Sequence, residues 1–280
     1  MTEESSRNAA GRAPLRPPPA GPEAGRLGLG LCSVTFRRLP APEVARRAAD
    51  AGLEVIEWGA DVHAPPGEPG TVSAVRQATE RHGLACCSYG SYFRATPGEL
   101  AGFPAVARAA VLLGAPRIRV WAGATGSRSA LPDERQETVS CLREAARIAA
   151  DHGLLLAPEF HGGTLTDTVA STARLLDEVD ADNVRTYWQP PLDTPREEAL
   201  AGLASLADRV CAVHAFSWWP GNNRLPLADR SDLWAAALGL LAGRGVEALL
   251  EFVPGDDPAV LAREAATLRG CAGRTPAGRP

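Results

Sequence analysis

Short apolar runs alternate with longer amphipathic segments from residue 27 onward. Each apolar run has the length of a buried strand. The predicted strands cover residues 27–36, 55–58, 84–89, 117–123, 154–160, 185–190, 210–216 and 248–253. Because a helical segment follows each of these runs, the pattern predicts a parallel sheet covered by helices. Eight strand–helix units favour closure into a (β/α)8 TIM barrel, an α/β fold.

The predicted helices have clear start and stop signals. Prolines stand at or just before several starts, and glycines follow several ends, where a left-handed cap is favoured. The helices cover residues 42–51, 72–82, 99–113, 133–152, 167–179, 196–207, 232–242 and 258–268. An open doubly wound sheet is the alternative, but it normally has a glycine-rich phosphate turn after its first strand. Residues 31–38, LCSVTFRR, contain no such turn.

The length of 280 residues suits one large domain, since α/β barrels run to about 250 residues around a single core. Residues 1–26 are rich in proline, glycine, alanine and arginine without an apolar stretch, so we expect a disordered tail and no signal peptide. The barrel is predicted to span residues 27–270, with a flexible C-terminus at 271–280. The cysteines show no C-x-x-C spacing, and no apolar run could span a membrane. We therefore expect a cytoplasmic protein.

Charge narrows the choice of partners. The net charge is −4, which excludes the basic surface that nucleic acid or an anionic membrane requires. All 29 basic residues are arginine, so no lysine is present to form a Schiff base. A small, neutral or moderately charged molecule is the expected partner, and assembly into a homo-oligomer is left open.

Four potential metal ligands lie near the C-terminal ends of the last four predicted strands: Glu159, Gln189, His214 and Glu251. In a barrel these ends meet at one mouth, so residues distant in sequence become neighbours. Two carboxylates, an imidazole and an amide oxygen suit Mn²⁺, Mg²⁺, Co²⁺ or Zn²⁺. Spacing alone does not decide the matter, because any barrel has polar strand ends. An ion pair of Glu251 with Arg119 or Arg185 is the structural alternative.

The segments PEFHGG, YWQP, VHAFSW and LLEFV, with GLEVIEWG and HGLACCSYGSY before them, resemble the xylose-isomerase-like barrel superfamily. That superfamily includes sugar isomerases, epimerases and inosose dehydratases. The resemblance covers roughly residues 27–268 and implies that Glu159, Gln189, His214 and Glu251 hold one divalent metal. The family has aspartate where Gln189 stands, so weaker metal binding, substitution by Asp193 or complete loss of the metal are the alternatives.

By this resemblance Glu159 and Glu251 form an acid–base pair that works through an enediolate. The implied function is a metal-dependent isomerase or epimerase of a sugar or polyol. A dehydratase or lyase acting on an inosose or glycoside with the same site is one alternative, and a non-catalytic sugar-binding barrel with a decayed metal site is another. An endonuclease would need a basic groove and more histidines than the five present.

Aromatic residues support a sugar substrate, since five of the six tryptophans fall at or just beyond predicted strand ends. Asp256 and Asp257 after the last strand would repel a phosphate, so a substrate without phosphate is favoured. Glu57 is either a supporting acid or part of a buried ion pair. The candidate substrate-binding residues are His63, Tyr92, Trp121, His161, Trp188, Trp218 and Arg224.

Overall fold

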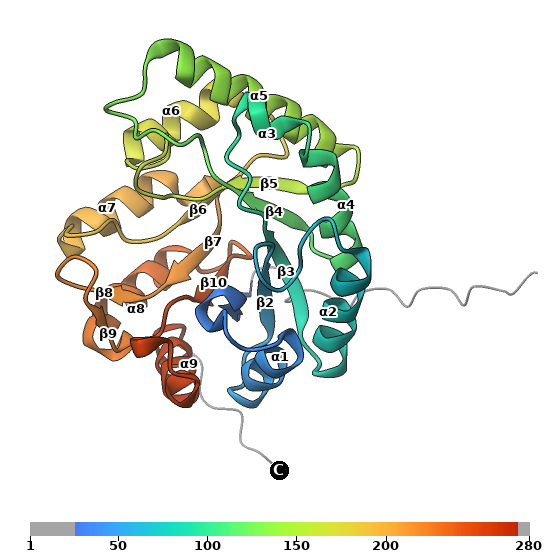
Figure 1. Cartoon of the computed structure of the whole chain (residues 1–280). Coiled ribbons are helices and arrows are strands. Elements are labelled where there is room, and N and C mark those ends of the chain that lie inside the picture. The colour runs from blue at the N-terminus through green and yellow to red at the C-terminus, as the bar shows by residue number, and fades with distance from the viewer. Residues whose placement is uncertain (1–25, 274–280) are drawn as a thin grey trace, which may run out of the picture.

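The computed structural model describes residues 26–273, and these form a nearly closed (β/α)8 barrel with helices around the strands (Figure 1). The fold predicted from the alternation of strands and helices is thereby confirmed. The expected disordered tail lies outside the described residues except for Arg26, and so does the expected flexible C-terminus beyond residue 273. None of the described helices is long and apolar enough to cross a membrane.

Eight parallel strands build the barrel. They are β1 (Gly28–Cys32), β2 (Val55–Gly59), β3 (Ala85–Gly90), β4 (Arg117–Val120), β5 (Leu155–Pro158), β6 (Thr186–Trp188), β7 (Val210–Ala215) and β10 (Glu247–Leu250). Hydrogen bonds join them in the order β5-β4-β3-β2-β1-β10-β7-β6. β5 and β6 are the two ends of this order. A single parallel bridge between Leu156 of β5 and Val184, just before β6, nearly closes the ring. The short hairpin of β8 (Ser217–Trp218) and β9 (Arg224–Leu225) follows β7.

The helices follow the predicted punctuation. They are α1 (Ala41–Asp50), α2 (Pro69–Arg81), α3 (Pro97–Leu100), α4 (Phe103–Leu113), α5 (Pro132–Ala150), α6 (Val169–Val179), α7 (Arg196–Leu206), α8 (Ser231–Leu240) and α9 (Leu261–Cys271). Gly114 ends α4 with a φ of 75°, which a residue without a side chain adopts readily. The predicted helix at 99–113 is divided into α3 and α4, with Gly102 just before the second helix.

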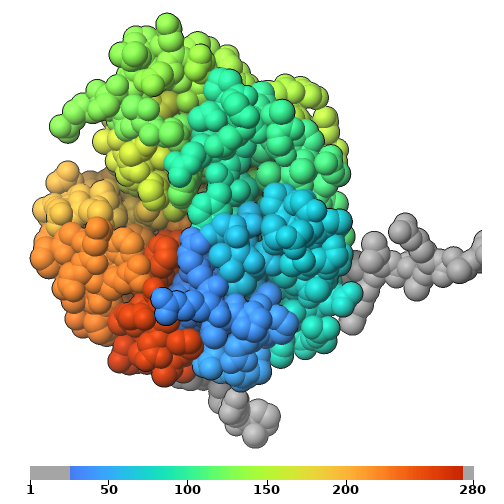
Figure 2. Space-filling view, viewed as in Figure 1, coloured from blue at the N-terminus to red at the C-terminus, as the bar shows by residue number. Residues whose placement is uncertain are grey.

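The first strand is shorter than predicted. It ends at Cys32, and residues 33–36 form the 3₁₀ helix η1 (Ser33–Phe36). All four residues of η1 are buried, so the apolar pattern continues although the backbone has turned. The backbone N–H of Phe252 donates to Thr35 Oγ1 (3.1 Å), which joins η1 to the segment after β10. Figure 2 shows these blue and red segments side by side near the middle of one face.

The core has two layers. A large apolar cluster fills the space between strands and helices, as in other barrels. A smaller cluster inside the ring, here called the inner cluster, consists of Cys32, Val34, Val55, Cys87, Ala157, Tyr187, Ala212 and Leu249. Buried ionisable side chains share this interior with the inner cluster: Glu57, Arg117, Arg119, Glu159, His214, Glu247 and Glu251. Buried charges need partners, so the contacts among these groups decide what the interior can do.

Candidate metal and acid–base site

The structure brings the four predicted metal ligands together at one end of the barrel. The Nδ1 atom of His214 lies 3.1 Å from Gln189 Oε1, 3.2 Å from Glu159 Oε1 and 3.4 Å from Glu251 Oε2. His214 is completely buried, and the side chains of Glu159 and Glu251 are 4% and 8% exposed. These four residues, here called the mouth set, come from strands that are far apart in the sequence.

The two-residue period of a strand explains why the mouth set faces inward. Each member lies two positions after a residue of the inner cluster, and successive side chains of a strand alternate between faces. The preceding residues are Ala157, Tyr187, Ala212 and Leu249. Backbone hydrogen bonds continue just past two strand ends: Glu159 donates to Val120 O (2.9 Å) and Glu251 to Ala215 O (3.2 Å). The mouth set is therefore held by the sheet itself.

The donor set fits a divalent cation. Glu159, His214 and Glu251 offer ligand atoms that lie within 4.8 Å of one another. Two ligands of one cation, each at about 2.1 Å, are roughly 3–3.5 Å apart, and the three contacts to His214 Nδ1 fall in this range. Oxygen and imidazole donors without sulfur suit Mn²⁺, Mg²⁺, Co²⁺ or Zn²⁺. Glu159, Gln189, His214 and Glu251 would hold such an ion.

Glu159 is firmly anchored on the side away from His214. Its Oε2 atom accepts a hydrogen bond from Trp121 Nε1 (2.6 Å) and another from the Arg119 guanidinium. Burial by itself would raise the pKa of Glu159, but Arg119 and then His214 lower it to about 2. This carboxylate is therefore ionised at neutral pH and has little freedom to turn.

Glu251 is in a different environment. Its Oε2 atom approaches His214 Nδ1 at 3.4 Å. Burial raises the pKa of Glu251 to about 7; His214 opposes this shift and the Glu159 carboxylate adds to it. Two neighbouring carboxyl groups with such different pKa values are typical of acid–base sites.

Arg119 forms its ion pairs with Glu159 and Glu57, and not the pair with Glu251 that was the structural alternative. Besides binding Glu159, it donates from Nε to Glu57 Oε1 (2.8 Å), while Arg185 bonds backbone carbonyls. A Cβ atom at Gly90 would lie 2.7 Å from Arg119 Nη2 and 3.0 Å from Glu57 Oε1, so glycine makes room for this pair. Glu57 thus belongs to a buried ion pair, one of the two roles expected for it. A charged residue inside an apolar strand is the signal in the sequence for both partners.

Three candidate substrate-binding residues form an aromatic wall beside Glu159. The rings of Trp121 and His161 stack with centroids 5.0 Å apart, and Tyr92 meets Trp121 edge-on at 5.4 Å. The guanidinium of Arg94 lies 4.2 Å from the centroid of Trp121. This wall is continuous with the mouth set, because the Trp121 indole donates directly to Glu159.

Two further candidates lie beside Glu251. The Arg224 guanidinium lies 5.2 Å from the Trp218 ring and 4.8 Å from the ring of Phe252, which follows Glu251 in the chain. Arg224 also pairs with Asp256 (2.6 Å). A cavity of about 570 Å³ opens here, a size that suits a small molecule. It is lined by Val34, Thr35, Phe36, Arg37, Arg38, Leu39, Arg224, Phe252, Gly255, Asp256 and Pro258.

The remaining two candidates lie apart from the mouth set. The ring nitrogens of His63 contact Ser33 Oγ (3.1 Å) and the Leu39 carbonyl (3.0 Å), so both have partners within the protein. Trp188 is fully buried, and its ring lies 6.0 Å from that of Trp234 in α8, on the helix side of the barrel. Successive side chains of a strand point to opposite faces, so the inward position of Gln189 places the adjacent Trp188 on the outer face.

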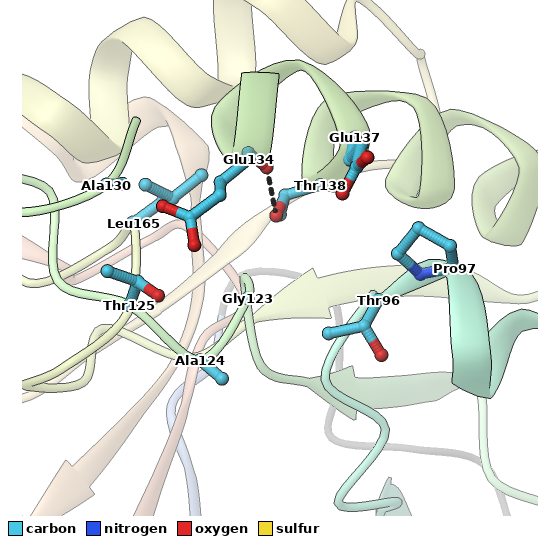
Figure 3. Close-up of a pocket in the computed structure, with 10 residues that line it drawn as sticks. All are labelled: Thr96, Pro97, Gly123, Ala124, Thr125, Ala130, Glu134, Glu137, Thr138 and Leu165. Atoms are coloured by element: carbon cyan, nitrogen blue, oxygen red, sulfur yellow. Dashed lines mark hydrogen bonds between the residues drawn. The ribbon is translucent and has the colours of Figure 1, made fainter. Parts of the chain in front are cut away.

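A smaller pocket lies under α5 (Figure 3). Its lining comes from α5 and from the segments after β3, β4 and β5, and it includes the carboxylates of Glu134 and Glu137. Glu134 accepts from the backbone N–H of Leu131 (2.8 Å), which caps the start of α5. No member of the mouth set lines this pocket.

The fold is shared with solved structures of several sugar and dehydratase enzymes. The probable 3-DHS dehydratase AsbF of Bacillus anthracis superposes with a TM-score of 0.73 at 20% identity, covering 86% of this chain and 98% of that one. D-allulose 3-epimerase of Methylomonas sp. gives 0.66 at 17%, with 86% and 96% covered. A magnesium complex of a xylose isomerase-like TIM barrel protein of Mycobacterium smegmatis gives 0.62 at 16%, with 91% and 99% covered.

One curated relative matches in sequence. A 3-dehydroshikimate dehydratase of Bacillus anthracis is 42% identical over 69 residues, which is a quarter of this chain and a quarter of the relative's own length. The family model described as a xylose isomerase-like TIM barrel matches residues 45–191, slightly more than half of the chain. That span contains Glu159 and Gln189 of the mouth set. The chain therefore belongs to the xylose isomerase-like TIM barrel family.

Proposed function

We propose that this protein is a divalent-metal-dependent enzyme that removes a proton from the carbon next to a carbonyl group in a small hydroxylated substrate. The convergence of three oxygen donors on His214 Nδ1, within 3.4 Å, carries this proposal. When bound, the cation would stabilise the negative charge that develops on the substrate oxygens. The proposed substrates are sugars, polyols and related hydroxylated ring ketones.

Glu251 is the group that moves the proton. Among the described residues no strong hydrogen-bond donor holds its carboxylate, and burial raises its pKa to about 7, which suits a group that accepts and returns a proton near neutral pH. Glu159 acts as a fixed anion, because Arg119 and Trp121 engage its Oε2 atom and keep the carboxylate ionised. The wall of Tyr92, Trp121 and His161 orients the substrate and excludes water.

The asymmetry between the two carboxylates favours elimination of water. Glu251 takes the proton as the C–H bond breaks, and the same group then gives it to the hydroxyl on the next carbon. That C–O bond breaks, water leaves, and the electron pair of the former C–H bond forms a C=C bond. One acid–base group is enough for these two transfers. The partial match to a 3-dehydroshikimate dehydratase supports the same outcome.

Isomerisation or epimerisation of a sugar is the second candidate. It requires that a proton return to the opposite face or to the adjacent carbon, and Glu159 would be the second acid–base group. Trp121 beside Glu159 and Trp218 on the side of Glu251 suit the C–H faces of a sugar and support this candidate. The anchoring of Glu159 by Arg119 opposes it.

A substrate screen in D₂O tests the proposal. The protein is stripped with chelator, reloaded separately with Mn²⁺, Mg²⁺, Co²⁺ or Zn²⁺, and offered 3-dehydroshikimate, inososes and ketoses. Elimination gives a product lighter by one water, whereas isomerisation gives a product of equal formula that carries solvent deuterium on carbon. Failure to bind any of the four ions would overturn the proposal and favour a non-catalytic sugar-binding barrel.

A further inference from the structure

We propose that Glu57 is a positioning residue for His214, and that it turns the Nδ1 lone pair of this imidazole toward the other members of the mouth set. This inference rests on the proposed metal site. Glu57 lies in β2, and its side chain is 1% exposed. Its Oε1 atom lies 3.7 Å from His214 Nε2. That nitrogen is buried and has no hydrogen-bond partner within the described residues.

The two nitrogens of His214 face different surroundings. Nδ1 faces Gln189, Glu159 and Glu251, whereas Nε2 faces Glu57. A neutral imidazole carries one N–H, and the nitrogen that binds a cation must offer its lone pair. A carboxylate beside Nε2 favours the proton on that nitrogen and leaves Nδ1 free as a ligand. Metal-binding histidines commonly have such a carboxylate behind them, and it fixes both the tautomer and the ring orientation.

Glu57 is itself held in place from both sides. Tyr187 donates from its hydroxyl to Oε2 (2.7 Å), and Arg119 donates from Nε to Oε1 (2.8 Å). The same guanidinium also binds Glu159, one of the proposed metal ligands. One arginine therefore holds both Glu159 and Glu57, the carboxylate behind His214. The carboxylate of Glu57 therefore cannot turn away from His214 without breaking two buried hydrogen bonds.

A second metal site in this place is the competing explanation. Cys32, Glu57 and His214 offer ligand atoms within 4.8 Å of one another. However, both oxygens of Glu57 already accept hydrogen bonds. The positive charge of the Arg119 guanidinium beside Glu57 would also repel a second cation. The contacts of Glu57 thus favour support of His214 over ligation of a further ion.

Metal affinity provides a readout that is independent of turnover. Stripped wild-type protein, Glu57→Gln and Glu247→Gln are titrated with Co²⁺ and Mn²⁺. Glu247→Gln is the matched control, since Glu247 is another buried carboxylate of the barrel interior, bound to Arg117 (2.7 Å) and not to the mouth set. We expect Glu57→Gln to weaken metal binding about 10- to 100-fold. Glu247→Gln should bind with wild-type affinity.

Histidine ¹⁵N spectra of the metal-free protein, taken at a pH at which the His214 imidazole is neutral, add a signature of the tautomer that no cation fixes. In the wild type we expect His214 to carry its proton on Nε2, and in Glu57→Gln we expect this preference to weaken. If Glu57→Gln does not fold, Tyr187→Phe removes one of the bonds that hold Glu57 and should weaken binding in the same direction, by less.

The outcomes separate this inference from the proposed function. Wild-type protein that binds no metal would overturn the proposed function and the inference with it. Wild-type protein that binds metal, with unchanged affinity and tautomer in Glu57→Gln, would overturn the inference alone. Sulfur-to-cobalt charge-transfer absorption would identify Cys32 as a ligand. This result would contradict the positioning role of Glu57 and indicate a second metal site at Cys32, Glu57 and His214.

Discussion

The two halves of the barrel interior both contain buried charges, but they arrange them differently. The half at the N-terminal ends of the strands is here called the lower half, and the half at their C-terminal ends, which holds the mouth set, the upper half. In the lower half, Arg117 and Glu247 begin β4 and β10 and form a single ion pair of 2.7 Å. In the upper half, the carboxylates of Glu57, Glu159 and Glu251 surround one guanidinium and one imidazole. These two charges pair one to one, and Arg117 also donates from Nε to the Tyr187 hydroxyl (3.0 Å), while its Nη2 atom has no partner within the described residues. The excess of carboxylates in the upper half leaves acceptor atoms that a cation or a substrate proton can use.

One strand supplies the permanent positive charge of both halves. Arg117 and Arg119 are two residues apart in β4, so both point into the ring. The difference between the halves therefore lies in the other strands, which bring one carboxylate to Arg117 and two to Arg119. A buried charge is no sign of function by itself, because structural ion pairs are also buried. Convergence of several like charges is the informative feature.

Replacing Glu251 by glutamine tests the upper half most severely. Because glutamine cannot accept the proton, we expect turnover to fall by about 10² to 10⁴. Steady-state assays on the substrate identified by the screen measure this loss, and thermal unfolding checks that the fold is retained. Glu247→Gln is the matched control and should keep its turnover. Full activity in Glu251→Gln would contradict the acid–base role of this residue.

The lower half is expected to respond mainly in stability, because Arg117 is linked to Glu57 indirectly, through the Tyr187 hydroxyl. Arg117→Met leaves Glu247 buried without its partner, which should reduce the free energy of unfolding by about 3–5 kcal/mol. Urea denaturation measures the loss. The double variant Arg117→Met with Glu247→Leu should regain most of it, because no charge is then left unpaired. A strong loss of metal affinity in folded Arg117→Met would show that the two halves are not independent.

Gln189 stands where the resemblance to the family implies an aspartate, and introducing a carboxylate there tests the position. Gln189→Asp adds a ligand charge to the site, so we expect metal binding to tighten roughly tenfold. Calorimetric titration measures the change. Asp193→Asn is the control, since Asp193 already accepts a hydrogen bond from the Gly221 N–H (2.7 Å) and should not act as a substitute ligand. Unchanged affinity in Gln189→Asp would mean that position 189 does not contact the metal.

The fold and the mouth set could be predicted from the sequence because both depend on repeated local patterns. Parallel strands end at one rim, so a polar residue after each apolar run identifies the rim. The partners of Arg119 could not be predicted in this way. They come from β2 and β5, and the contact with Glu57 passes over Gly90 of β3, which depends on the register of neighbouring strands. The side of the sheet that a residue faces was also ambiguous at strand ends, as Trp188 illustrates.

His63 lies outside both halves, and we expect the smallest effect there. Burial lowers the pKa of His63, so the unfolded chain binds the proton more readily than the folded one. The contribution of His63 to stability is therefore present above the ordinary histidine pKa of about 6.5 and declines as the pH falls below it. His63→Gln should flatten this part of the stability–pH profile, measured by thermal unfolding between pH 5 and 8, and change turnover little. A large loss of turnover would instead support the substrate-binding role expected from the sequence, because the bonds of His63 to Ser33 and Leu39 would then have to open for the substrate.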